Sequence, residues 1–238
     1  MRGRASIGLA YAVLGLVLAR GGTPDVVEAR EAAVPVSHEP THQVRFDNGT
    51  VRIYDVVLQK GQWSLFHEHA ADNFYVFFSA TTQLFEFSDG RKGANLVKAG
   101  DVGFSSTQAG PYTHRVGDGG DEPVHVADVE ILSAAHARPA RAAAARVAAP
   151  FNLALENARG RVYRIVLAAG ESTPAFTRPA HTAIFAVTAG RISERTAGGA
   201  PRLWDPRPGD FRWTDRAEAV TLTNESDAPS TLVEVEVY

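Results

Sequence analysis

The sequence predicts an all-β protein made of two tandem jelly-roll barrels that arose by internal duplication. Residues 54–61 match residues 163–170, and residues 100–104 match residues 209–213, so that both pairs lie 109 positions apart (54 to 163 and 100 to 209). Two matches at one offset indicate a repeated unit. Within each copy, short β-rich runs alternate with turn signals, and this spacing is typical of a jelly roll.

The strands expected in the first copy are runs rich in β-branched and aromatic residues, bounded by Gly, Asn and Asp. They cover residues 51–58, 63–69, 74–78, 83–87, 102–105 and 124–132. The second copy repeats the pattern between residues 161 and 238. The closing segments align at a smaller offset of 106 (121 to 227), so the first copy holds three extra residues before its last strands.

The chain begins with the pattern of an export signal. Arg2 and Arg4 precede an apolar run at residues 5–19, and Val17 and Ala19 are small enough for a signal peptidase to cut after residue 19. Left uncut, the same run would act as an N-terminal anchor. We therefore expect an exported protein, periplasmic or extracellular, with a signal peptide or anchor at 1–19, a tether at 20–40, the first barrel at 41–133, a linker at 134–150 and the second barrel at 151–238.

The composition excludes several classes of function. The formal net charge is -3 and the Lys and Arg residues are scattered, which argues against a nucleic-acid partner because phosphate binding needs a concentrated basic face. The chain has no cysteine, so disulfides, thiolate metal ligands and a cysteine nucleophile are excluded. Beyond the possible N-terminal anchor, no segment is apolar and long enough to span a membrane.

A pair of histidines carries the strongest chemical signal. His67 and His69 lie two positions apart in an aromatic, apolar segment, so on a strand both imidazoles leave the same face. A third imidazole from a later strand, that of His114, would complete a facial set of nitrogen ligands for a divalent transition metal and leave positions open for water or substrate. His38 and His42 fall in a Pro-flanked stretch, and we interpret them as solvated.

These histidines stand in motifs that resemble those of the cupin family. Gly61 is followed after five residues by His67 and then by His69, as in the first cupin motif. Gly100, Pro111 and His114 resemble the second motif, with an interval to the histidine that is three residues longer. The resemblance implies a two-domain cupin.

The same resemblance implies a set of site residues. His67, His69 and His114 are the expected metal ligands of the first barrel. The family places a glutamate ligand where this chain has Asn73, and the nearest acid is Asp72, so these two residues are the candidates for a fourth ligand. Glu68, between the two histidines, is expected to point out of the barrel.

The second copy lacks these histidines. The offset of 109 places Phe176 on His67 and Arg178 on His69, and the interval of the second motif places Val220 at the position of the third histidine. We therefore expect the second barrel to have no metal site. Arg178 is a candidate for a carboxylate-binding pocket, and His181 is interpreted as a structural residue.

The resemblance implies a divalent transition metal, namely Fe, Mn, Ni, Cu or Zn, and a small-molecule ligand. The aromatic residues around the motif favour an aromatic or partly apolar ligand, and Tyr112, two positions before His114, is the candidate proton donor. Three functions stay open: a metal-dependent dioxygenase or isomerase, a non-catalytic module that binds a small molecule or metal, and a structural pair of barrels. The chain is expected to be a monomer or a homodimer.

Overall fold

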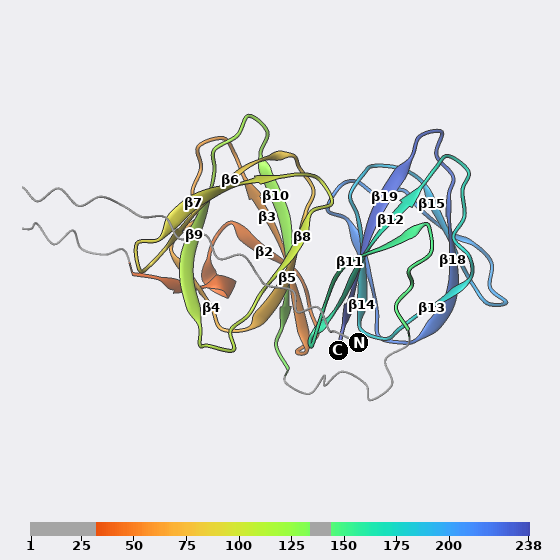
Figure 1. Cartoon of the computed structure of the whole chain (residues 1–238), viewed down its shortest axis with the longest axis horizontal. Coiled ribbons are helices and arrows are strands. Elements are labelled where there is room, and N and C mark those ends of the chain that lie inside the picture. The colour runs from red at the N-terminus through yellow and green to blue at the C-terminus, as the bar shows by residue number, and fades with distance from the viewer. Residues whose placement is uncertain (1–31, 134–143) are drawn as a thin grey trace, which may run out of the picture. The chain divides into compact units, whose positions relative to one another are not determined.

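The computed structural model describes residues 32–133 and 144–238. The predicted signal segment, the tether up to residue 31 and the linker at 134–143 lie outside the described residues. Ala32–Tyr238 form one unit by their contacts. It contains an N-terminal module (residues 34–131) and a C-terminal module (residues 151–237), each built from two sheets (Figure 1).

The N-terminal module consists of two five-stranded sheets. The first, called the histidine sheet here, has the order β1 (Val34–Pro35), β4 (His67–His69), β9 (Tyr112–Asp118), β6 (Thr81–Phe87) and β7 (Lys92–Val97). The second has the order β2 (His42–Asp47), β3 (Val51–Leu58), β10 (Val124–Ile131), β5 (Asp72–Phe77) and β8 (Val102–Ser105). A short 3-10 helix, η1 (Val36–His38), joins β1 to β2.

The C-terminal module repeats this arrangement. One sheet has the order β11 (Phe151–Asn157), β12 (Gly160–Leu167), β19 (Ser230–Val237), β14 (Thr182–Ala186) and β17 (Phe211–Thr214). The other has the order β13 (Phe176–Arg178), β18 (Glu218–Asn224), β15 (Ile192–Thr196) and β16 (Arg202–Trp204). The all-β prediction is confirmed, and the matching strand orders show that the sequence repeat is a repeat of structure.

The predicted strands match the observed ones best where the apolar pattern is strong. Residues 51–58 and 102–105 coincide with β3 and β8. Residues 63–69 were predicted as one strand, but only His67–His69 form β4, and Trp63 makes an isolated bridge to Gly117. The prediction missed β2, β7 and β9, because their sequences are rich in polar residues and Gly.

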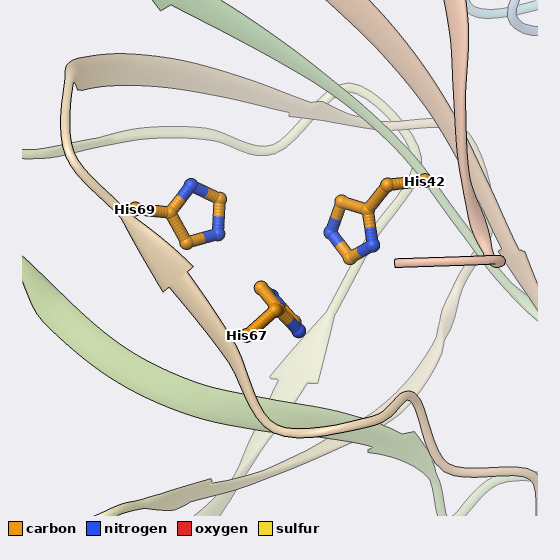
Figure 2. Close-up of side chains that lie close together, drawn as sticks. All are labelled: His42, His67 and His69. Atoms are coloured by element: carbon orange, nitrogen blue, oxygen red, sulfur yellow. The ribbon is translucent and has the colours of Figure 1, made fainter. Parts of the chain in front are cut away.

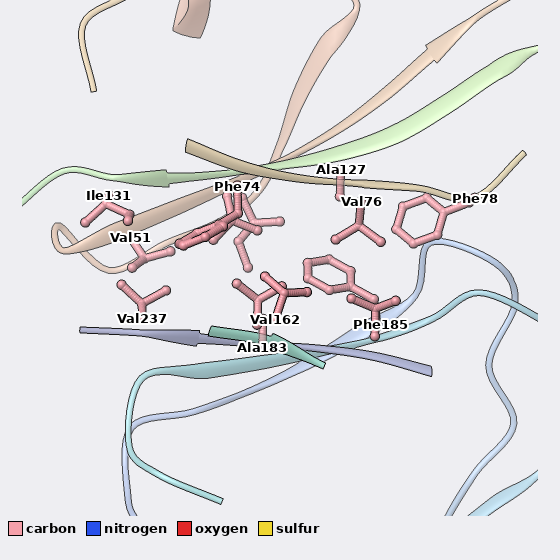
Figure 3. Close-up of a cluster of buried hydrophobic side chains, with 14 of the residues drawn as sticks. Val51, Phe74, Val76, Phe78, Ala127, Ile131, Val162, Ala183, Phe185 and Val237 are labelled. Carbon is pink, nitrogen blue, oxygen red and sulfur yellow. The ribbon is translucent and has the colours of Figure 1, made fainter. Parts of the chain in front are cut away.

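Both faces of the sheet that contains β3, β5 and β10 are buried. One face packs directly on the C-terminal module, so that Phe74 and Val76 meet Val162 and Phe185 in a shared core (Figure 3). The alternate residues, such as Val56 and Phe77, point into the N-terminal module. Because both faces are buried, the sequences of these strands are nearly continuous apolar runs.

Part of the predicted tether belongs to the N-terminal module. Val34 and Pro35 pair in parallel with His67 and Glu68, so the chain before β2 lies along the histidine sheet. Val36 is buried, and so is Glu39. Within residues 32–133 and 144–238, no helix has the length and apolar character that a membrane span requires.

Candidate metal centre

The structure brings the three predicted histidines together. His67 and His69 leave the same face of β4 and are 0% and 1% exposed, whereas Glu68 between them is exposed, as predicted. On the neighbouring strand β9, His114 pairs directly with His67. The ring centroid of His114 lies 4.7 Å from that of His67 and 5.1 Å from that of His69.

A fourth imidazole, that of His42, completes the cluster. Its ring centroid lies 4.4 Å from that of His67 and 6.1 Å from that of His69. One ligand atom from each of His42, His67 and His69 lies within 4.8 Å of the other two, and Figure 2 shows the three rings facing one another. His114 is not a member of that group, although its ring packs against those of His67 and His69, and the four histidines are together called the histidine cluster here.

The interpretation of His42 as solvated is therefore wrong, although His38 is exposed as expected. His42 is 5% exposed because it is the first residue of β2, where the chain turns from η1 into the interior of the module. The pairing of β1 with β4 fixes this path, and that contact joins segments about thirty residues apart. Local composition around Pro40 gives no sign of it.

Outer acceptors orient the imidazoles. Nδ1 of His67 lies 2.9 Å from the carbonyl oxygen of Leu65, and Nδ1 of His42 lies 2.7 Å from Oε2 of Glu39. Each acceptor holds the proton on Nδ1, which leaves the lone pair of Nε2 available. Nε2 of His67 is buried and has no hydrogen-bond partner among the described residues. Nδ1 of His69 lies 3.7 Å from Oε1 of Glu130.

Burial keeps two of the cluster's imidazoles neutral. Burial, with the neighbouring imidazoles, lowers the pKa of His67 from its usual 6.5 to about 2. The same causes lower the pKa of His114 to about 3. A neutral imidazole with a free Nε2 is the form that binds a divalent transition metal. The donor set, with its buried and unpartnered Nε2, fits such an ion.

Glu39 is held as an anion beside this cluster. Burial raises its pKa, but hydrogen bonds from His42, from Thr41 and from the backbone N–H of Leu65 outweigh burial and lower the pKa to about 2. A buried carboxylate with five donors is a fixed negative charge next to the imidazoles. It complements a cation bound among them.

The two candidates for a fourth ligand lie in different places. Asn73 is buried at the cluster, where its Oδ1 accepts a hydrogen bond from Tyr112 and its Nδ2 donates one to Asp128. Asp72 instead points toward the C-terminal module, where it pairs with Arg159 at 3.0 Å and accepts the backbone N–H of Thr107. Of the two, only Asn73 faces the cluster.

A cavity of about 210 Å³ opens from the histidine cluster into the N-terminal module. Its walls are aromatic and amide side chains, and none of the described residues that line it is Lys or Arg. The lining includes His42, His69, His114, Tyr75, Phe77, Gln83, Phe85, Phe87, Asn95, Tyr112 and Asp128. Of the aromatic residues near the motif, Tyr75, Phe85 and Phe87 line the cavity, whereas Phe74 and Phe78 lie in the shared core.

Tyr112, the predicted proton donor, lies at the cluster. Its ring stacks on that of His69 with centroids 5.0 Å apart and an angle of 18° between the planes. Its hydroxyl donates to Oδ1 of Asn73 at 3.1 Å. Burial raises the pKa of Tyr112 well above 10, so the hydroxyl stays protonated and can donate. Burial also raises the pKa of Asp128.

The C-terminal module has other residues at the equivalent positions. Phe176 pairs with Val220 in the register that His67 and His114 show, and Arg178 stands at the position of His69. The offset of 109 places the buried Phe151, the first residue of β11, on His42, the first residue of β2, so both modules bury a ring at this position.

Two further residues of the C-terminal module were predicted. Arg178 is buried, and three carboxylates surround it, those of Glu194, Glu218 and Glu234. It pairs with the protein's own acids and is not an open carboxylate-binding site. His181 lies in the left-handed backbone region with a φ of 58°.

No family model matches the chain, and no curated protein matches it in sequence. Solved structures match it in fold. AerE from Microcystis aeruginosa gives a TM-score of 0.58 at 11% identity and covers 84% of this chain and 98% of its own. YhhW from Escherichia coli gives 0.56 at 18% identity, with 83% and 82% covered. A variant of oxalate decarboxylase from Bacillus subtilis gives 0.54 at 13% identity, with 79% and 69% covered.

Proposed function

The chain has the fold of the two-domain cupins, and from this premise we propose that its N-terminal module holds a divalent transition metal and presents it to a small organic ligand. The observation that carries the proposal is the histidine cluster with its outer acceptors. Burying several imidazoles costs free energy, because their charged forms lose hydration and the neutral forms need partners. A metal bound to Nε2 of His67, which has no hydrogen-bond partner among the described residues, would offset part of that cost.

His67 and His69 belong both to the predicted ligand set and to the group of converging ligand atoms. His114 and His42 flank them from β9 and β2. Four imidazoles suit Fe, Mn, Ni, Cu or Zn. When bound, such a metal supplies a Lewis acid or an oxygen-activating centre. Mn(II) centres occur in oxalate decarboxylase from Bacillus subtilis, a solved structure with the same fold.

The cavity defines the kind of ligand. Aromatic walls favour a ligand with an apolar or aromatic body, and the paired amides of Gln83 and Asn95 offer hydrogen bonds to a polar substituent. Since Asp128 lines the cavity and none of the described lining residues is Lys or Arg, a neutral ligand fits better than a carboxylate.

The residues around the cluster supply proton chemistry. Tyr112 holds its proton next to His69 and can give it to an oxygen of the ligand. Asn73 connects Tyr112 to Asp128 through hydrogen bonds of 3.1 and 3.4 Å. This arrangement suits a dioxygenase or an isomerase that acts on an enol or a phenol. The proposal includes export, supported by the signal pattern at residues 1–19, which would place the site in the periplasm or outside the cell.

Two experiments test the proposal in order. Elemental analysis of protein purified without added metal should find a transition metal, and the His67→Ala variant should lack it. Turnover or O2 uptake is then measured on a panel of phenols and 1,2-dicarbonyls. Turnover that is lost in His67→Ala supports the enzyme. Bound metal with ligand binding but no turnover would overturn catalysis and leave a binding module.

A further inference from the structure

The closing strands of the two modules carry the same pair of buried acids. On β10 these are Asp128 and Glu130, and on β19 they are Glu234 and Glu236. Asp128 pairs with Tyr54 as Glu234 pairs with Tyr163, so the two pairs occupy equivalent positions in the duplicated fold. Alternate residues of a strand share a face, so both acids of each pair point into their own module.

In the N-terminal module this acid pair faces imidazoles. Oδ2 of Asp128 lies 3.7 Å from Nε2 of His42, and Oε1 of Glu130 lies 3.7 Å from Nδ1 of His69. The pair therefore lies behind the proposed metal centre. Its carboxyl oxygens face the imidazoles that would hold a cation.

In the C-terminal module the acid pair faces guanidinium groups. Arg178, at the position of His69, places its Nε 3.5 Å from Oε2 of Glu234 and its Nη1 2.9 Å from Oε2 of Glu194. A second guanidinium, that of Arg146, pairs with Glu234 and lies 3.0 Å from Oε1 of Glu236. The C-terminal module has kept the acids and replaced the imidazoles.

Arg146 does not belong to the strands of the module. It lies in the segment before β11, and its side chain, 15% exposed, enters the module from there. Its guanidinium carbon lies 4.1 Å from the ring centroid of Tyr163, 4.6 Å from that of Phe176 and 4.7 Å from that of Phe151. Two of these rings, Phe151 and Phe176, stand where the N-terminal module has His42 and His67.

We propose that the C-terminal module carries a second ligand site, a cage for an alkylguanidinium group, which the side chain of Arg146 occupies in this structure. The cage consists of the rings of Phe151, Tyr163 and Phe176 and the carboxyl groups of Glu234 and Glu236. The duplicated fold thus holds a cation in both modules. In the N-terminal module the cation is a metal under the proposed function, whereas in the C-terminal module it is organic.

The geometry selects guanidinium over ammonium. A planar guanidinium stacks on aromatic faces and presents several N–H groups in a fixed fork, which matches two carboxylates on one strand. One Nη2 atom of Arg146 serves both Glu234 and Glu236, and Nη1 reaches the carbonyl oxygen of Thr177 at 3.4 Å. An ammonium has no planar face to stack on the rings and no fork of N–H groups that would reach the carbonyl oxygen of Thr177 as well as the acids, so it makes fewer of these contacts.

Chemical rescue tests the cage. The Arg146→Ala variant removes the internal occupant, and n-propylguanidinium at about 10 mM is offered in its place, with n-butylammonium at the same concentration as the comparison. We expect Arg146→Ala to lower the midpoint of thermal unfolding by at least about 4 °C, and n-propylguanidinium to restore at least about half of that loss. Butylammonium should restore much less.

The matched control is Arg191→Ala, which removes an exposed arginine that pairs with Asp205 on the surface. Neither that variant nor the unmodified protein should gain stability from n-propylguanidinium. Equal responses in all three proteins would overturn the proposal. If Arg146→Ala does not fold, refolding yield is measured with each cation: recovery with n-propylguanidinium alone supports the cage, and equal or no recovery with both cations overturns it.

Discussion

Nδ1 of His42 lies 2.7 Å from Oε2 of Glu39, and both side chains are almost completely buried. The contact links the turn after η1 to the histidine cluster. It makes Glu39 the carboxylate that orients one of the four imidazoles. A residue outside the predicted barrel thus acts on the site through a neighbour.

Glu39→Gln should therefore weaken metal binding. Gln keeps an oxygen for the N–H of Leu65 but loses the negative charge that faces His42. Loss of such an outer partner typically lowers metal affinity by about 10- to 100-fold. Competition with a chromogenic chelator measures the change, and Glu68→Gln, which alters an exposed acid, serves as the control. Equal metal affinities for the two variants would show that Glu39 does not support metal binding.

His42→Ala distinguishes a four-imidazole site from the three-histidine set predicted from sequence. If His42 binds the metal, its loss should lower affinity at least about tenfold, because one donor is removed from the ion. His38→Ala, which changes the exposed last residue of η1, provides the control. Unchanged affinity in His42→Ala would restore the three-histidine set.

Tyr112→Phe tests the proton donor. The variant keeps the ring that stacks on His69 and removes only the hydroxyl that donates to Asn73. Metal content should match that of the unmodified protein, while turnover of a substrate found in the panel should fall by about 10²-fold or more. Turnover at the original rate would show that Tyr112 transfers no proton.

Metal-free protein should lose stability in acid. The pKa values of His67 and His114 in the folded protein, about 2 and about 3, lie below the usual 6.5, so the unfolded chain binds more protons below pH 6.5. Their contribution is therefore fully present above pH 6.5 and is lost as the pH falls. Each imidazole costs about 1.4 kcal/mol per pH unit in that window. Denaturant unfolding at a series of pH values measures the slope.

Glu236 opposes this trend and provides an internal check. Burial raises its pKa from 4.5 to about 7, although Arg146 acts to lower it. Its contribution to stability is therefore present below pH 4.5 and is lost as the pH rises through about 7. The Glu236→Gln variant should lose stability more steeply than the unmodified protein between pH 6.5 and 4.5. If stability changes with pH equally in the variant and in the unmodified protein, the pKa of Glu236 is not raised in the folded state.

The shared core should make the two modules unfold together. Phe185 is 0% exposed and packs in the core that both modules contribute to. Phe185→Ala should cost about 3–5 kcal/mol, and fluorescence and circular dichroism should report one coincident transition. Leu203→Ala, at an exposed position, should cost little. Two separate transitions would show that the shared core does not couple the modules.

The repeat and the strand periodicity predicted much of the fold from sequence, because duplicated turns and doubly buried strands leave strong local patterns. His67, His69 and His114 followed from their motif. His42 did not, since its burial depends on β1 pairing with β4, a contact between distant segments. The position of Asp72, a candidate fourth ligand, could not be predicted for the same reason, because its partner Arg159 lies in the other module.

The histidine cluster as a metal centre is the central claim, and the metal content of the purified protein tests it most directly. Elemental analysis should find about one transition-metal ion per chain in the unmodified protein and almost none in His67→Ala, with both variants folded by circular dichroism. Equal, near-zero metal in both, even after incubation with Fe, Mn, Ni, Cu and Zn salts, would contradict the account.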